Sequence, residues 1–443
     1  MFTKIKFKIQ FITTFVKRHF IAIIAIIIAI TLPSIFHKQI INFFLSPSFR
    51  TQRIALEGLY TTNTLPNEIS EKISYGLTTI SKNGKAINSP LVENIENKDD
   101  KEYIFTLKTD LYWHNGKKLT SYDINYQIEG ATITPISDQQ FKIVLDNNFA
   151  PLLSNLSQPL FKKNLVGLGE YKIKKITYKE GYIKTLLLKP IDNDKVSIKY
   201  NFYSNQEDVI DAFKLAIVDQ IKINSLPEEF NTWKNIEIKK NIETDDKYIA
   251  IFLNTQKIQE KKIRQALAYA TPKTKEKNER AFGPISPTSW AYNPAVKEYE
   301  FSRSRAKELF EKESLPEINL TINNRSLLTL AEEIKNSWAD VLDIETSISI
   351  TNQIDLQNYD AILAYSATTK DPDQYNFWHS TQLNTNITKL NNSRIDKLLE
   401  EGRAITDPIE RRDIYLDFQK FLLEESPAIF LSYPTTYTLT RLK

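Results

Sequence analysis

Two aspartates separated by one proline, Asp371 and Asp373, form a compact pair of carboxylates in this sequence of 443 residues. Paired carboxylates act as acid and base when their surroundings separate their pKa values and a third group assists them. No such group lies near them in the sequence, and a turn made rigid by Pro372 explains the pair about as well. We therefore expect no catalytic residues, with a hydrolase that uses Asp371 or Asp373 as an open alternative.

Other reactive side chains are scarce in this sequence. It has no cysteine, which excludes disulfides, thiolate catalysis and cysteine-ligated zinc. The histidines are His19, His37, His114 and His379. No two of them have the i, i+4 spacing of a helical metal site, and the sequence has no phosphate-binding glycine loop or nucleophile elbow. We expect neither a metal site nor a cofactor.

The composition is typical of a folded protein with more than one core. Hydrophobic residues make up 41% and charged residues 25% of the chain, as in globular proteins. A chain of this length is too long to fold around one ordinary hydrophobic core. The formal net charge is only +4, from 58 basic and 54 acidic residues. Because a nucleic-acid groove needs basic residues concentrated on one face, nucleic acid is not an expected partner.

The N-terminal segment has the pattern of a membrane anchor. Residues 1–19 contain basic but no acidic residues, and the run 20–36 carries no charge. Together with the apolar stretch 40–45, this run approaches the ~20 residues that cross a bilayer. Basic flanks stay in the cytoplasm, so residues 46–443 should lie on the extracytoplasmic side. We predict a basic cytoplasmic segment and a single transmembrane helix within 1–45, with a cleaved signal peptide as the alternative.

Strand-like and helical stretches alternate after the anchor, as in α/β proteins. Segments with strand-like character are 104–108, 141–145, 171–176, 186–189 and 196–202. The apolar run 248–253 indicates a strand buried on both faces, and apolar spacing predicts a helix over 261–270. Gly402 is placed to end another helix. Asp407 as N-cap and Pro408 at the first helical position predict the start of the last one.

Several short motifs follow one another along the chain. They are IALEGLY at 54–60, WHNG at 113–116, VGLGEY at 166–171, IRQALAYA at 263–270, GPISP at 283–287 and DPD at 371–373. In this order they resemble the oligopeptide- and dipeptide-binding family of extracellular solute-binding proteins, family five, from about Ile54 to the C terminus. Two departures stand out. The stretch between Asp123 and Phe141 is short, and 365–370 lacks the acid that holds the ligand's amino terminus in peptide-binding members.

The resemblance implies a two-lobed periplasmic-binding-protein-like α/β fold of type II. One lobe would comprise 46–247 with 429–443, including a trimmed subdomain near 75–165, and the other 248–428. The strands that cross between the lobes would lie at 248–254 and 429–433, and the ligand would be enclosed between the lobes.

The implied function is that of a membrane-anchored receptor that delivers a small solute to the permease subunits of an ABC importer and is not an enzyme. A sensor, or a domain of this fold that docks a protein, is the alternative. The expected pocket is largely apolar with a few fixed polar groups. The residues expected to contact the ligand are Tyr60, Thr61, Trp290, Tyr365, Asp371, Asp373 and Tyr375. Trp113 and His114 are expected to be structural.

Overall fold

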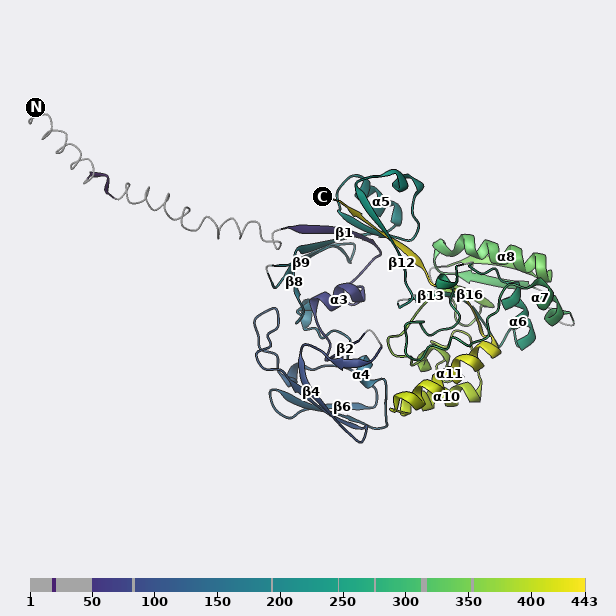
Figure 1. Ribbon diagram of the computed structural model, residues 1–443, viewed down its shortest axis with the longest axis horizontal. Helices are drawn as coiled ribbons and strands as arrows, with labels where there is room; N and C mark the ends of the chain where they lie inside the picture. The colour runs from purple at the N-terminus through teal and green to yellow at the C-terminus, as the bar shows by residue number, and fades with distance from the viewer. Residues whose placement is uncertain are drawn as a thin grey trace, which may run out of the picture.

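A computed structural model describes residues 18–20 and 50–442, except for 82–83, 193, 246, 275, 312–316 and 352–353. Two lobes lie side by side, and a smaller subdomain extends from the first of them (Figure 1). The predicted anchor within 1–45 lies outside the described residues, apart from 18–20. In the described part of the chain, no helix combines the length and the hydropathy needed to span a membrane.

The first lobe is built on a seven-stranded sheet with the order β12-β18-β11-β1-β10-β9-β8. Its strands are β1 (Thr51–Glu57), β8 (Tyr171–Lys179), β9 (Tyr182–Pro190), β10 (Ser197–Tyr203), β11 (Gln220–Ile223), β12 (Ile236–Ile242) and β18 (Thr435–Arg441). Helix α3 (Asn67–Ile73) packs in one apolar cluster with Leu56, and α5 (Gln206–Lys214) in another with Ala55. Because neighbouring residues of a strand point to opposite faces, the two helices cover opposite faces of the sheet.

The subdomain contains a four-stranded antiparallel sheet with the order β4-β5-β7-β6. Its strands are β4 (Val92–Lys98), β5 (Glu102–Leu107), β6 (Ala131–Pro135) and β7 (Gln140–Leu145), accompanied by the hairpin β2 (Thr78–Ile80) and β3 (Ala86–Asn88) and by helix α4 (Leu152–Asn155). Phe105 and Phe141 stack in its core with ring centroids 5.0 Å apart. The short stretch after Asp123 forms a loop and the single strand β6.

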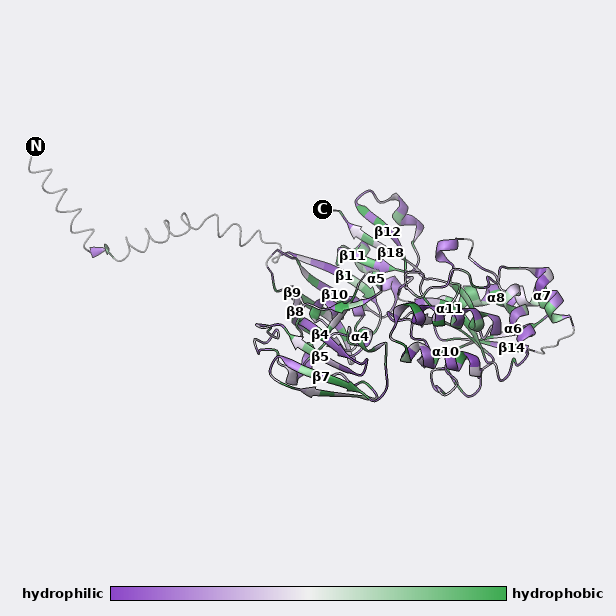
Figure 2. Ribbon diagram, turned by 60° about the horizontal axis from the view of Figure 1, so that its bottom comes forward, coloured by the Kyte–Doolittle hydropathy of each residue, from purple (hydrophilic) through white to green (hydrophobic). Residues whose placement is uncertain are grey.

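The second lobe is a five-stranded sheet, β15-β14-β16-β13-β17, between two layers of helices. Its strands are β13 (Lys247–Leu253), β14 (Glu317–Ile322), β15 (Glu345–Ile350), β16 (Ala361–Ala367) and β17 (Ala428–Ser432). The helices are α6 (Lys261–Ala270), α7 (Arg303–Phe310) and α8 (Leu328–Leu342) in one layer, and α9 (Tyr375–Trp378), α10 (Ser393–Ala404) and α11 (Pro408–Glu425) in the other. Hydrophilic and hydrophobic residues mix along these helices (Figure 2), as expected when one helix face lies on a sheet.

Local sequence signals place several of these elements correctly. Strand β13 alternates between the two helical layers, with Ile251 in one apolar cluster and Phe252 in the other, so it is buried on both faces as predicted. Asp407 caps α11 by accepting hydrogen bonds from two backbone N–H groups. The expected helix end at Gly402 is wrong, because α10 continues to Ala404. A Cβ at this position would lie 2.9 Å from the ring of Tyr415, so close helix packing explains the glycine.

Two strand pairs connect the lobes. β12 leads into β13, and β17 leads back into β18. β12 pairs with β18 in the first sheet, and β13 pairs with β17 in the second. The return was expected at 429–433. Ala428–Ser432 pairs within the second sheet, and the chain passes back at Tyr433 and Pro434, whose carbonyl accepts a hydrogen bond from Glu243 N at 2.9 Å.

Candidate ligand-binding site

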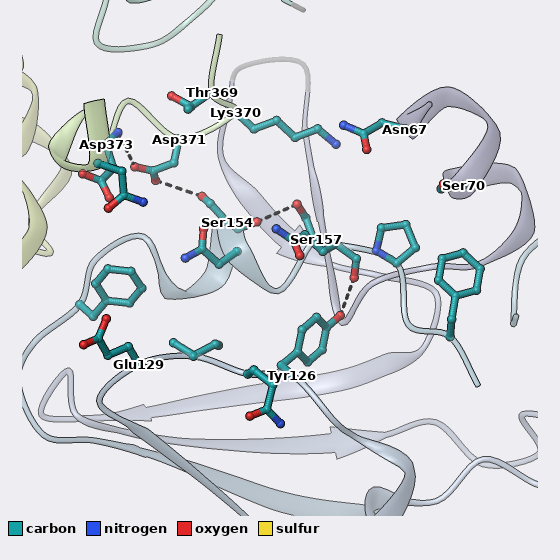
Figure 3. Close-up of a pocket in the computed structure, with 18 of the residues that line it drawn as sticks. Asn67, Ser70, Tyr126, Glu129, Ser154, Ser157, Thr369, Lys370, Asp371 and Asp373 are labelled. Carbon is teal, nitrogen blue, oxygen red and sulfur yellow. Dashed lines mark hydrogen bonds between the residues drawn. The ribbon is translucent and has the colours of Figure 1, made fainter. Parts of the chain in front are cut away.

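A cavity of about 1390 Å³ lies between the lobes. The first lobe contributes the segment from Thr62 through α3, and its subdomain contributes residues near Tyr126 and Ser154. The second lobe contributes the loop between β16 and α9, together with Arg403 of α10. Figure 3 shows these side chains around a common space. The ends of elements and the loops that join them form most of the wall.

The wall of the cavity is rich in neutral polar groups. Side-chain amides come from Asn63, Asn67, Gln127, Asn147, Asn148, Asn155, Gln158, Asn164 and Asn376. Hydroxyl groups come from Thr62, Ser70, Ser154, Ser157, Thr368 and Thr369. Aromatic rings are present as well, from Phe149, Phe161 and Phe377 among others. The pocket is therefore more polar than the largely apolar one predicted, because loops rather than apolar sheet faces line it.

Asp371 and Asp373 line the cavity, and each is held by an arginine. Their contact with a ligand stays a prediction. Arg411 donates to both oxygens of Asp371, at 2.5 and 3.0 Å, and both side chains are less than a tenth exposed. Arg403 Nε donates to Asp373 at 2.9 Å. Burial raises the pKa of Asp373 above its ordinary value, although Arg403 acts in the opposite direction. Both carboxylates therefore serve first as anchors for the second lobe's own arginines.

Asp371 also connects the two lobes. Ser154 of α4 donates a hydrogen bond to its Oδ2 at 3.1 Å, across the edge of the cavity. Nearby, Ala150 N donates to the carbonyl of Arg403 at 2.7 Å, and the hydroxyl of Thr406 donates to Asp100 at 2.6 Å. Subdomain and second lobe are thus in direct polar contact along one side of the cavity.

Tyr375 and Trp290 lie beside the cavity and are not part of its lining. The ring of Tyr375 stacks on His379 at 4.1 Å, and the guanidinium of Arg403 lies 4.0 Å from its centroid. Trp290 faces Arg411 at 5.5 Å and meets the subdomain at Gly84, where a Cβ would lie 2.9 Å from its Cδ1. Both aromatic rings flank the arginines that hold the two aspartates, and direct contact with a ligand stays a prediction for them.

Tyr60, Thr61 and Tyr365 also lie outside the lining, although Thr62, next in sequence, is part of it. The ring of Tyr60 packs on Phe202 at 5.1 Å, and its hydroxyl donates to the carbonyl of Glu57. Thr61 shares a hydrogen bond with the hydroxyl of Thr64, 3.1 Å away. Tyr365 lies within hydrogen-bond distance of Ser326, at 3.1 Å. Their contact with a ligand likewise stays a prediction.

An ion pair between the lobes was missed by the sequence reasoning. Lys370 Nζ lies 2.5 Å from a carboxylate oxygen of Glu71 on α3, and both residues line the cavity. The partners lie 299 residues apart, and neither belongs to a motif. Nothing in the local sequence could have identified the pair.

His114 and His379 each have polar partners within the fold. A ring nitrogen of His114 lies 2.9 Å from the carbonyl oxygen of Gly169, and burial lowers the pKa of this histidine. His379 contacts Thr381 at 2.8 Å and Glu400 at 3.2 Å. No group of three or more histidine or acidic side chains within the described residues is arranged to hold a metal ion.

The chain is similar to several curated binding proteins, whereas no protein-family model matches it. It is 22% identical to the oligopeptide-binding protein AppA of Bacillus subtilis over 397 residues, which cover 78% of the chain and 68% of AppA. It is 21% identical over 406 residues to the probable D,D-dipeptide-binding protein DdpA of Escherichia coli, covering 75% and 76%. Over 208 residues it is 26% identical to heme-binding protein A of Haemophilus influenzae, covering 41% and 38%.

Solved structures share its fold. NikZ from Campylobacter jejuni, in complex with Ni(L-His), superposes with a TM-score of 0.75 at 20% identity, covering 88% of the chain and 94% of NikZ. AppA from Bacillus subtilis, in complex with a nonapeptide, gives 0.72 at 18% identity, covering 88% and 95%. DppA from Helicobacter pylori, in complex with the peptide STSA, gives 0.71 at 17% identity, covering 88% and 94%. The predicted two-lobed type II fold is confirmed.

These relatives are solute-binding proteins and not enzymes, in agreement with the absence of a catalytic site predicted from the sequence. Sequence and fold together confirm the resemblance of this chain to the oligopeptide- and dipeptide-binding solute-binding proteins of family five.

Proposed function

We propose that this chain is the extracytoplasmic receptor of an ABC importer and captures a small peptide-like solute between two hinged lobes. The observation that carries the proposal is the cavity of about 1390 Å³ whose wall is shared by both lobes. Its relatives support the ligand class, since AppA and the dipeptide-binding proteins are named for peptides. A Listeria monocytogenes protein described as an ABC transporter substrate-binding protein has the same fold, with a TM-score of 0.73.

The amide-rich wall suits a peptide-like ligand. Each asparagine or glutamine side chain offers N–H donors and a carbonyl acceptor, and so does each peptide group. Amides such as Asn67 and Asn155 can therefore bind the backbone of a ligand whatever side chains it carries. Fixed aromatic rings such as Phe149 and Phe377 add apolar area that favours burial.

Closure is a rotation about the strand crossings. β12–β13 and β17–β18 are short, paired and continuous with both sheets, so each lobe can move as a rigid body while the residues between the strands change their dihedral angles. A ligand that contacts both walls binds the closed form better and shifts the population toward it. The permease would recognise this closed form.

We further propose that residues 1–45 anchor this receptor in the membrane and leave the binding lobes on the extracytoplasmic side. The basic residues before the uncharged run 20–36 support this orientation. The units that move would be the first lobe, with its subdomain near 75–165, and the second lobe, predicted over 248–428.

The proposal is tested by mass spectrometry of small molecules released from the full-length chain purified from its own cells. We expect a peptide-like compound, which should raise the melting temperature when it is added back to protein from which it was removed. Release of no small molecule, together with no stabilisation by mixed peptides, would contradict the proposal.

A further inference from the structure

The charged groups that the second lobe turns toward the cavity are already paired. They lie in the loop between β16 and α9, where Lys370, Asp371 and Asp373 follow one another closely. Arg411 holds Asp371 and Arg403 holds Asp373, both within the second lobe. Lys370 alone is paired across the cleft, with Glu71. Among its described residues, this wall therefore offers a ligand no charged side chain that is free of a protein partner.

The Glu71–Lys370 pair joins the two lobes at the cavity. Glu71 lies on α3 of the first lobe, and both side chains are 47% exposed. In Figure 3 the side chain of Lys370 extends from its loop in the direction of Asn67, at the start of α3. Because each partner comes from a different lobe, the pair forms only when the lobes approach one another. When the lobes close, the charges of Glu71 and Lys370 therefore neutralise each other.

A ligand with a charged end would meet this neutralised wall. Its ammonium or carboxylate would lose water on closure and would either compete with the ion pair or stay without a partner, and both outcomes weaken binding. A ligand end that is an amide or another uncharged polar group avoids this loss. It also finds matching donors and acceptors in the amides and hydroxyls of the wall, such as Asn67 and Thr369.

Four other charged residues line the cavity: Lys162, Glu129, Asp146 and Lys163. Lys162 is paired with Asp123 of the subdomain at 2.7 Å. Glu129, Asp146 and Lys163 are exposed, and none of these three makes an ion pair with another described residue. Water and salt screen such groups strongly. Figure 3 shows Glu129 on the opposite side of the view from Lys370. Glu129, Asp146 and Lys163 lie where they can attract a charged solute to the rim of the cavity. None of them takes part in an ion pair that forms when the lobes close.

We propose that the Glu71–Lys370 ion pair determines specificity by selecting peptide-like ligands whose ends carry no charge. This inference rests on the proposed function and adds the charge of the ligand to it. The pair excludes a charged end because its two charges satisfy each other when the cleft closes. Removing one partner should therefore expose the other as a new site for a ligand end of opposite charge.

The test uses the full-length chain, immobilised in detergent, and four pools of random tetrapeptides made only from uncharged amino acids. The pools differ only at their ends: both free, only the amino end acetylated, only the carboxyl end amidated, or both blocked. Mass spectrometry of the retained peptides measures the enrichment of each pool. For the natural chain we expect the fully blocked pool to be enriched most.

Each of two single variants should change this preference, one toward peptides with a free amino end and the other toward peptides with a free carboxyl end. Lys370→Gln leaves the carboxylate of Glu71 free, so we expect roughly tenfold greater enrichment of the pool with a free amino end and an amidated carboxyl end. Glu71→Gln frees Lys370 and should favour the acetylated pool with a free carboxylate by a similar factor. The double variant Glu71→Lys with Lys370→Glu rebuilds the pair in reverse and should restore the preference for blocked ends.

Glu229→Gln is the matched control. Glu229 pairs with Lys214 at 2.5 Å and is 48% exposed, but this pair lies within the first lobe and outside the cavity lining. It should leave the ranking of the pools unchanged. Binding of all pools with a ranking that neither single variant alters would overturn the inference and leave the proposed function standing. Retention of no pool by the natural chain would overturn both.

Discussion

The two walls of the cleft differ in the kind of polar side chain that they present. The wall of the second lobe is dense in charge, and both of its aspartates have fixed partners within the lobe, as Asp371 has Arg411. The wall of the first lobe and subdomain is dominated by neutral amides and hydroxyls, such as Asn67 and Ser154. A buried ion pair is rigid and expensive to break, whereas amides exchange partners at little cost. The comparison indicates that one wall sets the shape of the site and the other adapts to the ligand.

The largest expected effect on stability comes from removing Arg411 from the charged wall of the second lobe, called the rigid wall below. Arg411→Met leaves the carboxylate of Asp371 buried without its cation, which should lower the free energy of unfolding by about 3–5 kcal/mol. Urea denaturation measures the loss. Arg303→Met is the control, because its pair with Asp340 is exposed in the same lobe, and it should leave stability unchanged. Equal stability of Arg411→Met and the natural chain would refute the rigid wall.

A smaller effect is expected where the walls touch. Ser154→Ala removes the hydrogen bond to Asp371 across the cleft, worth about 1 kcal/mol, and should weaken ligand binding several-fold without destabilising either lobe. Calorimetric titration with the copurified ligand measures the change. Ser121→Ala, which removes a hydrogen bond to Ser137 within the subdomain, should leave affinity unaltered. Equal affinity losses in both variants would count against a closed form held by Ser154.

At the strand crossings, unlike at the two walls, we expect an effect on stability that depends on low pH. Burial works against ionisation of Glu243, but bonds from Thr436 and Lys222 outweigh it and hold its pKa below the ordinary value of 4.5. The stability that Glu243 contributes is therefore fully present above about pH 4.5 and is lost as the pH falls through the lower folded-state pKa. Glu243→Gln should flatten the acid limb of the stability profile, measured by denaturation between pH 7 and pH 3. A limb as steep as that of the natural chain would show that other groups cause it.

The smallest effect on stability is expected at the Glu71–Lys370 pair. Its side chains are half-exposed, so Glu71→Gln should change the free energy of unfolding by less than about 1 kcal/mol, although it changes ligand preference. Thermal denaturation without ligand measures this. A loss as large as that of Arg411→Met would mean that the pair is part of the rigid wall.

Local sequence signals predicted elements of the fold better than they predicted the site. The cap at Asp407 and the doubly buried strand around Ile251 follow from side chains that act on their own segment. Gly402 was misassigned because its reason is the ring of Tyr415 on the next helix.

The site depends on pairings that no local pattern contains. Ser154 and Asp371 lie 217 residues apart in sequence, and Arg411 lies 40 residues after Asp371. The order of motifs identified the fold, and it pointed to the DPD turn, whose two aspartates line the cavity. It also pointed to Tyr60 and Trp290, which pack on Phe202 and against Gly84 beside the cavity. Motifs mark where the chain turns, and only the folded lobes decide which side chains meet.

The most direct test of the account is the distance between the lobes with and without ligand. Because the sequence has no cysteine, spin labels can be placed singly on each lobe through Tyr178→Cys and Leu383→Cys, at exposed positions. Pulsed electron resonance on the full-length chain should give a broad or longer distance without ligand and one shorter, narrow distance with it. An identical distribution in both conditions, with a ligand shown to be bound, would contradict a receptor that works by closing.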